Sequence, residues 1–95
     1  MPTLHDAADQ LARDIIANNL MGLMRAFTAS GMKKALTVQA QTGGAQDATG
    51  YVIEERGDGV VHIIFTAPDG GGAIVTRWVA SGDSWKVDDM STLDT

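Results

Sequence analysis

The two histidines are the side chains best suited to acid–base chemistry in this chain of 95 residues. His5 and Asp9 lie one helical turn apart, so they could act as a base and the carboxylate that orients it, or as two metal ligands. The plainer interpretation is an exposed His5 in the fraying first turn of a terminal helix. His62 falls within an expected strand, near Tyr51 or Glu55, where it could transfer a proton or simply be packed and hydrogen-bonded. We predict no catalytic residue from these patterns.

Four residues could form a small site for an apolar ligand. Asn19 lies near the middle of the apolar stripe of the expected N-terminal helix, and a buried amide needs polar partners. The sheet could supply those partners beside an indole ring, which is the usual composition of a ligand site. The predicted ligand-binding residues are Asn19, Thr76, Trp78 and Asp89. The alternative is that Asn19 caps or breaks the helix.

Other patterns that support chemistry are absent from the sequence. Asp88 and Asp89 are successive on an expected strand, so their carboxylates point to opposite faces and cannot share a metal ion. The glycines at 70–72 do not open a helix and therefore lack the oriented N–H groups of a phosphate loop. No zinc-ligand spacing, nucleotide-binding motif or Ser/His/Asp order occurs. The sequence predicts neither a metal site nor a cofactor.

The composition is that of a globular chain, with 44% hydrophobic residues, 20% charged residues and no cysteine. Its length predicts a single domain over residues 1–95. The net charge of -5 opposes binding to phosphate backbones, so we expect no nucleic-acid partner. No apolar stretch approaches the roughly 20 residues that span a bilayer, and the N-terminus lacks the features of a signal peptide. We therefore expect a cytoplasmic location and no membrane partner.

Residues 1–34 are expected to be helical, because apolar residues recur there mostly every three or four positions. Thr3 resembles a helix cap, and Asp9 and Arg13 are placed for an ion pair one turn apart. The apolar stripe drifts near Asn18, so the segment forms either one long helix or two. Ser30–Gly31 is expected to end it, with two lysines nearby that complement the helix dipole.

Residues 35–91 are expected to form an antiparallel sheet of four or five strands, followed by a tail at 92–95. Apolar and polar residues alternate in the first segment, and Gly-rich turns separate the others. The fold class is therefore α+β, a helix packed on a curved sheet. The expected strands are Leu36–Gln41, Thr49–Glu55, Val60–Ala67, Ala73–Ala80 and Ser84–Met90.

The turn at Gly82–Asp83 suits a two-residue hairpin loop with glycine at the first central position. This register pairs Trp78 with Val87 and predicts a cross-strand ion pair between Arg77 and Asp88. One face of the sheet then packs on the helix. The predicted core-facing residues are Val52, Val61, Ile63, Phe65, Ile74, Trp78, Ala80, Trp85 and Val87.

The second face carries more branched apolar residues than a sheet exposed to water usually shows. A self-complementary partner would cover it, since two-fold homodimers are the commonest oligomers. Scattered exposed apolar residues without a role are the alternative. Met90 is expected on this face, and the predicted dimer interface is Tyr51, Ile53, His62, Ile64, Val75, Arg77 and Val79.

A helical N-terminus, an antiparallel meander and a last strand that contains Trp85-Lys86-Val87-Asp88 together resemble the NTF2-like and cystatin-like superfamily. The resemblance covers roughly residues 48 to 90. It implies a curled sheet that wraps a helix to form a cone-shaped pocket, and dimers that form through the outer side of the sheet. The chain is shorter than most NTF2-like domains, which favours the cystatin-like end of the superfamily. Members include enzymes and non-catalytic binding domains, so the resemblance informs the fold more than the function.

Three functions fit these observations. The first is a small dimeric, non-catalytic binding domain, because no catalytic groups converge and the second face needs a partner. The second is an NTF2-like pocket enzyme or carrier for a small apolar ligand. The third is an acidic inhibitor or immunity-type protein that masks a basic surface, which the negative charge would suit.

Overall fold

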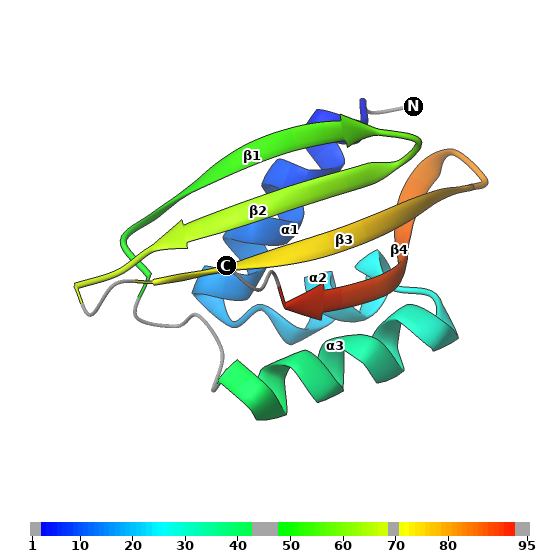
Figure 1. Cartoon of the computed structure of the whole chain (residues 1–95). Helices are drawn as coiled ribbons and strands as arrows, with labels where there is room; N and C mark the ends of the chain where they lie inside the picture. Colours follow the sequence, from blue (N-terminus) through cyan, green and yellow to red (C-terminus); the bar gives the residue numbers. More distant parts are fainter. Residues whose placement is uncertain (1–2, 43–47, 69–70, 93–95) are drawn as a thin grey trace.

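The computed structural model describes residues 3–42, 48–68 and 71–92. Three helices pack on a curved, unclosed sheet of four antiparallel strands, so the predicted α+β fold is confirmed (Figure 1). Residues 43–47 of the expected loop and 93–95 of the expected tail lie outside the described residues. The helices are α1 (Leu4–Ala17), α2 (Leu20–Ala26) and α3 (Ala29–Thr42), and the strands, in sheet order, are β1 (Gly50–Gly57), β2 (Val60–Thr66), β3 (Gly72–Ser81) and β4 (Ser84–Thr92).

The N-terminal helical segment breaks at Asn18. The Thr3 hydroxyl accepts a hydrogen bond from the Asp6 N–H at 3.0 Å and starts α1. Asn18 ends α1 with a left-handed φ of 55°, which asparagine tolerates better than most residues. Asn19 then caps α2, with its side-chain oxygen accepting from the Gly22 N–H at 3.3 Å. Of the two possibilities that the sequence left open, the one with two helices is correct.

The expected strand Leu36–Gln41 is wrong, because these residues belong to α3. Ser30 and Gly31, expected to end a helix, lie in its first turn. The Thr28 hydroxyl accepts from the Gly31 N–H at 3.0 Å and caps the helix. A Cβ at Gly31 would lie 1.9 Å from the Val87 carbonyl oxygen, so glycine allows α3 to approach the backbone of β4. This contact and the Ala, Lys and Gln content override the alternating pattern.

A β-bulge changes the register of the hairpin formed by β3 and β4. The turn at Gly82–Asp83 and the pairing of Trp78 with Val87 are as predicted. Beyond them, the Cα partner of Arg77 is Asp89, so the expected Arg77–Asp88 pair is wrong. The extra residue in β4 turns the following side chains over. Met90, expected on the second face, is therefore buried in the core.

A second bulge lies in β1, between Glu55 and Gly57. It reverses the predicted facing of the preceding residues. Tyr51 and Ile53 pack against the core, whereas Val52 points away from it and is 51% exposed. The three assignments were wrong for one reason: a single inserted residue shifts a period-two pattern by one position.

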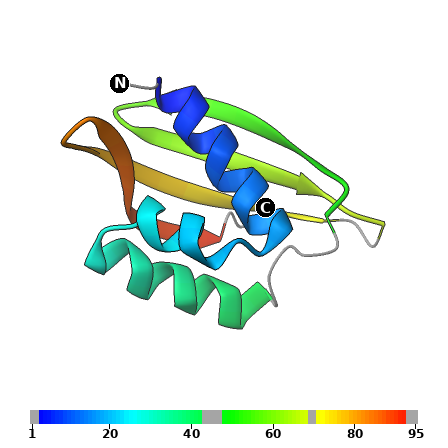
Figure 2. The same ribbon diagram turned by 180° about the vertical axis from the view of Figure 1, so that it is seen from behind.

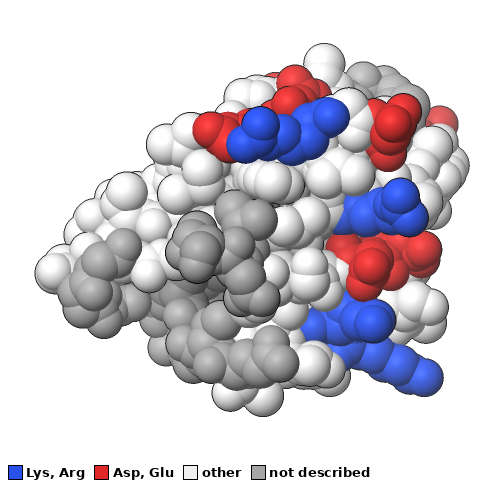
Figure 3. All heavy atoms as spheres, in the orientation of Figure 1, with Lys and Arg blue, Asp and Glu red and all other residues white. Residues whose placement is uncertain are grey.

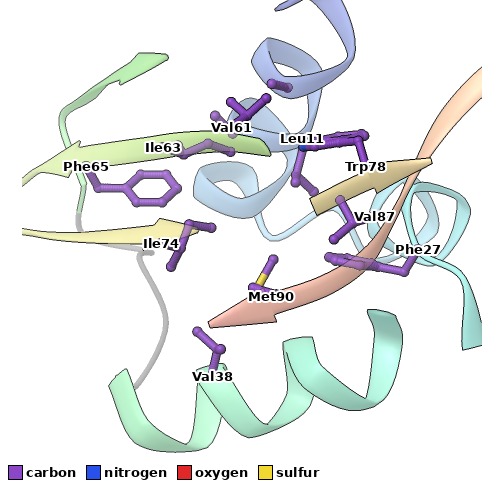
Figure 4. Packing of buried hydrophobic residues seen from close by; sticks show 12 residues of the cluster. Leu11, Phe27, Val38, Val61, Ile63, Phe65, Ile74, Trp78, Val87 and Met90 are labelled. Carbon is purple, nitrogen blue, oxygen red and sulfur yellow. The ribbon is translucent and has the colours of Figure 1, made fainter. Parts of the chain in front are cut away.

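The core lies between the sheet and α1, which crosses the rear of the sheet in Figure 1 and its front in Figure 2. Val61, Ile63, Phe65, Ile74, Trp78 and Val87 are buried as predicted (Figure 4). Trp85 packs against this core, whereas Ala80 is exposed near the end of its strand. The long helix α3 packs along β4 (Figure 2). Among the described residues, no helix combines the length and apolar character needed to cross a membrane.

Candidate interaction surface

One face of the sheet is turned away from α1, and we call it the outer face. No described helix lies over it in Figure 1, and α1 covers the opposite side in Figure 2. Side chains of directly opposed residues in antiparallel strands project from the same face, so the strand pairing gives its layout. The outer face comprises Val52, Glu54, Val60, His62, Ile64, Thr66, Ala73, Val75, Arg77, Val79, Lys86, Asp89 and Ser91.

An apolar row crosses the outer face. Val52 pairs with Ile64, and Ile64 pairs with Ala73, so three apolar side chains stand side by side across β1, β2 and β3. Val79 adds an exposed apolar side chain near the far end of β3. Apolar side chains grouped in this way are unusual on a sheet face that faces water.

His62 occupies the centre of the next row, between Glu54 on β1 and Val75 on β3. Its buried Nδ1 atom has no hydrogen-bond partner among the described residues. Buried polar atoms are nearly always paired in native structures. If the His62 ring rotated, a polar group of a binding partner could form the missing hydrogen bond with this nitrogen. The middle of the outer face is therefore a candidate contact point.

Charged residues occupy one end of the outer face. Arg77 stands opposite Asp89 across β3 and β4. Glu54 forms an ion pair with Arg56, with 2.7 Å between Glu54 Oε1 and Arg56 Nη2. Figure 3 shows charged side chains along the upper and right edges of this view, with uncharged surface on the left. The outer face thus has an apolar part and a part with both signs of charge.

Two of the predicted ligand-binding residues lie together in the core. The Trp78 Nε1–H donates to the Thr76 hydroxyl at 2.7 Å, and that hydroxyl donates to the Val61 carbonyl at 2.8 Å. Both side chains are buried. Each polar group is therefore used within the protein, and the pair fixes the orientation of the indole ring.

The other two predicted ligand-binding residues lie elsewhere. Asn19 is exposed at the start of α2, where its amide nitrogen also donates to Asp14 at 3.2 Å. Asp89 belongs to the outer face, and one of its oxygens accepts from the Met90 N–H at 3.0 Å. The bulge in β4 is what separates Asp89 from the core. The structure does not bring the four residues around one site.

A polar cluster joins α1 to β1, and only part of it was expected. The predicted ion pair is present, with Arg13 Nε 3.0 Å from Asp9 Oδ2. Tyr51 completes the cluster: its hydroxyl donates to Asp9 at 2.5 Å and accepts from Arg13 Nε at 3.1 Å. Tyr51 raises the pKa of Arg13 above its ordinary value, with a further contribution from Asp9. His5, expected beside Asp9, is exposed in the first turn of α1.

The predicted involvement of Tyr51 in the outer face is wrong, because the bulge in β1 turns its ring toward α1. The same holds for Ile53. The remaining predicted interface residues do share the outer face: His62, Ile64, Val75, Arg77 and Val79. Val52 lies on the outer face although the sequence pattern predicted it in the core. Placing it correctly would have required recognising the bulge near Arg56–Gly57.

Among the described residues, no three His, Asp or Glu side chains are grouped so that they could hold a metal ion. No protein-family model matches the chain, and neither the curated proteins nor the solved structures include a match to it.

Proposed function

We propose that this protein is a small non-catalytic interaction domain that self-associates through the outer face of its sheet. The observation that carries the proposal is the row formed by Val52, Ile64 and Ala73, which no described element covers. Removing such apolar side chains from water favours association. A second copy is the simplest partner, because one two-fold axis brings the same row from both protomers together.

The charges of the outer face support the same arrangement. Two antiparallel sheets pack face to face with their strands roughly aligned. Because residues away from a two-fold axis meet different residues of the other copy, Arg77 of one protomer can meet Glu54 or Asp89 of its partner. A face that carries both signs of charge is suited to binding a copy of itself.

The size of the face determines how strong the association should be. Four strands at their usual spacing cover about 19 Å by about 23 Å, on the order of 400 Å² in flat projection. Standard interfaces bury about 800 Å² per partner. We therefore expect a dimer that dissociates on dilution rather than one that is permanently associated.

Light scattering behind gel filtration, over a series of protein concentrations, tests the proposal. We expect a mass near twice the 10.0 kDa of the chain at high concentration and a monomer on dilution. Val79→Asp and Ile64→Asp should each keep the protein monomeric, because a dimer would bury the new carboxylate. Leu36→Asp is the matched control, since Leu36 is exposed on α3 and away from this face. A monomer at every concentration would contradict the proposal.

The resemblance to NTF2-like and cystatin-like domains remains a proposal, supported by the order of helices followed by a curved antiparallel sheet. The alternative of a ligand carrier or pocket enzyme has less support, because Asn19 and Asp89 lie away from Thr76 and Trp78. The alternative of an acidic inhibitor rests on the net charge of -5 alone. Binding to a basic partner that weakens steeply with salt would favour it.

A further inference from the structure

The charge of the chain is divided unevenly along the sequence. No acidic residue occurs between Asp14 and Asp47, whereas this stretch contains Arg25, Lys33 and Lys34. It carries a charge of +3, which leaves -8 for the rest of a chain whose total is -5. The stretch contains α2 and α3, which lie together in the lower part of Figure 2. Basic side chains are visible over the start of α3 in Figure 3. The two helices form the cationic end of an acidic protein.

The same end exposes large apolar side chains. Leu20, Met21 and Met24 of α2 are 64%, 66% and 68% exposed, and Leu36 of α3 is 59% exposed. At 100° per residue, the three α2 side chains and Arg25 lie on one side of that helix. We call Leu20, Met21, Met24, Arg25, Lys33, Lys34 and Leu36 the α2–α3 surface.

Contacts on the inner side of α2 hold this orientation. The Asp14 carboxylate lies against Gly22, where a Cβ would come within 2.4 Å of one of its oxygens. The Asn19 side chain accepts from the Gly22 N–H and donates to Asp14. Gly22 must therefore face α1, which turns the methionines outward. Asp14 and Asp88 accept hydrogen bonds from Gln10, Asn19 and Thr28, and among the described residues no carboxylate forms an ion pair with Lys33 or Lys34.

The exposure of these side chains indicates the kind of partner. Leu20, Met21 and Met24 are each about two thirds exposed, so their side chains protrude from the surface and do not line a groove. Protruding Leu and Met side chains flanked by Lys and Arg are typical of surfaces that insert among lipid headgroups. Basic residues near such a surface are attracted to anionic lipids. The overall composition predicts no membrane partner, but this local surface differs from the rest of the chain.

We propose that the α2–α3 surface binds reversibly to bilayers that contain anionic lipids. The apolar side chains of α2 enter the headgroup region, and Arg25, Lys33 and Lys34 lie against the lipid phosphates and carboxylates. The binding is peripheral, because α2 is only 7 residues long. It does not depend on the proposed dimer, whose surface is the outer face of the sheet.

Co-sedimentation of the full chain with vesicles tests the proposal. We expect binding to phosphatidylcholine vesicles that contain about one third phosphatidylserine, little binding to pure phosphatidylcholine, and weaker binding at high salt. The double variant Lys33→Gln/Lys34→Gln should bind about 25-fold more weakly, at about fivefold per lost basic residue. The double variant Met21→Gln/Met24→Gln should also lose binding, because it removes the inserting side chains.

The matched control is Val52→Gln, which changes an exposed apolar residue on the outer face and should leave vesicle binding unchanged. All substituted side chains are exposed, so the circular-dichroism melting curves should coincide with that of the unmodified protein. Failure to bind phosphatidylserine vesicles at low salt would overturn the proposal. So would equal binding by all variants, or binding to a soluble acidic polypeptide without any binding to vesicles.

Discussion

The hydroxyl of Thr28 donates a hydrogen bond to the carboxylate of Asp88 at 2.8 Å, across 60 positions of sequence. The same hydroxyl accepts from the Gly31 N–H, so the start of α3 is tied to the bulge of β4. Asp88 also places a negative charge at the positive end of the helix dipole. Without the bulge, the Asp88 carboxylate would project from the outer face; the extra residue turns it toward α3.

Replacing Asp88 with alanine should therefore destabilise the fold by about 1 to 2 kcal/mol, allowing for its partial exposure. Asp88→Asn keeps an acceptor oxygen and should therefore lose less stability than Asp88→Ala. The free energy of unfolding from urea titration measures both. Glu55→Ala, an exposed carboxylate on β1, is the control and should change stability by less than about 0.5 kcal/mol.

Gly31→Ala should destabilise the protein by about 3 kcal/mol or more, because the new methyl group would overlap the Val87 carbonyl and force α3 away from β4. The neighbouring change Ser30→Ala is exposed and should alter stability by less than about 0.5 kcal/mol. Thermal unfolding followed by circular dichroism compares the two. A Gly31→Ala variant as stable as Ser30→Ala would show that α3 does not lie this close to the strand.

Thr76→Val should cost about 1 to 3 kcal/mol although the two side chains have nearly the same shape. The substitution leaves the buried Trp78 Nε1–H without its acceptor, and an unsatisfied buried donor carries a desolvation penalty. Urea unfolding followed by tryptophan fluorescence measures the loss. Thr66→Val, at an exposed position of β2, should leave stability nearly unchanged. Equal effects at both positions would contradict a role for the Thr76–Trp78 hydrogen bond.

From the cluster of Asp9, Arg13 and Tyr51 we predict that the contribution of Arg13 to the free energy of unfolding does not depend on pH near neutrality. Tyr51 and Asp9 raise the folded-state pKa of Arg13 above its ordinary value. A raised pKa contributes stability that is complete below the unfolded-state value and is lost only as the pH rises through the folded-state value. Arg13 should therefore add no slope to the unfolding free energy between about pH 6 and pH 9. Urea midpoints of the protein and of Arg13→Gln should run parallel over this range, and converging curves would contradict the assignment.

The parts of the fold that depend on local signals could be predicted from the sequence. The turn at Gly82–Asp83 has glycine at the position with positive φ, and Gly82 adopts φ 61°. The cap at Thr3 and the burial of Val61, Ile63 and Phe65 also follow from short-range patterns. Each of these signals is contained within a few neighbouring residues.

The parts that depend on distant contacts could not be predicted. Leu36, Val38 and Ala40 alternate as in a strand, but the approach of Gly31 to Val87 places them in a helix. The two bulges add single residues that no periodicity reveals, and each inverted the facing of the residues beyond it. The predicted facing of the side chains was therefore correct on β2 and β3, which contain no extra residue, and wrong on β1.

The bulge in β1 has a consequence for how the surface of this protein could change. Removing the one extra residue near Arg56 would restore regular pairing and turn the strand over, while the turn at Asp58–Gly59 could stay as it is. Val52 would then enter the core, and Tyr51 and Ile53 would move to the outer face. Deleting a single codon could thus exchange one set of surface side chains for another without any substitution. In this strand, insertions and deletions therefore change the exposed face of the sheet more abruptly than point mutations do.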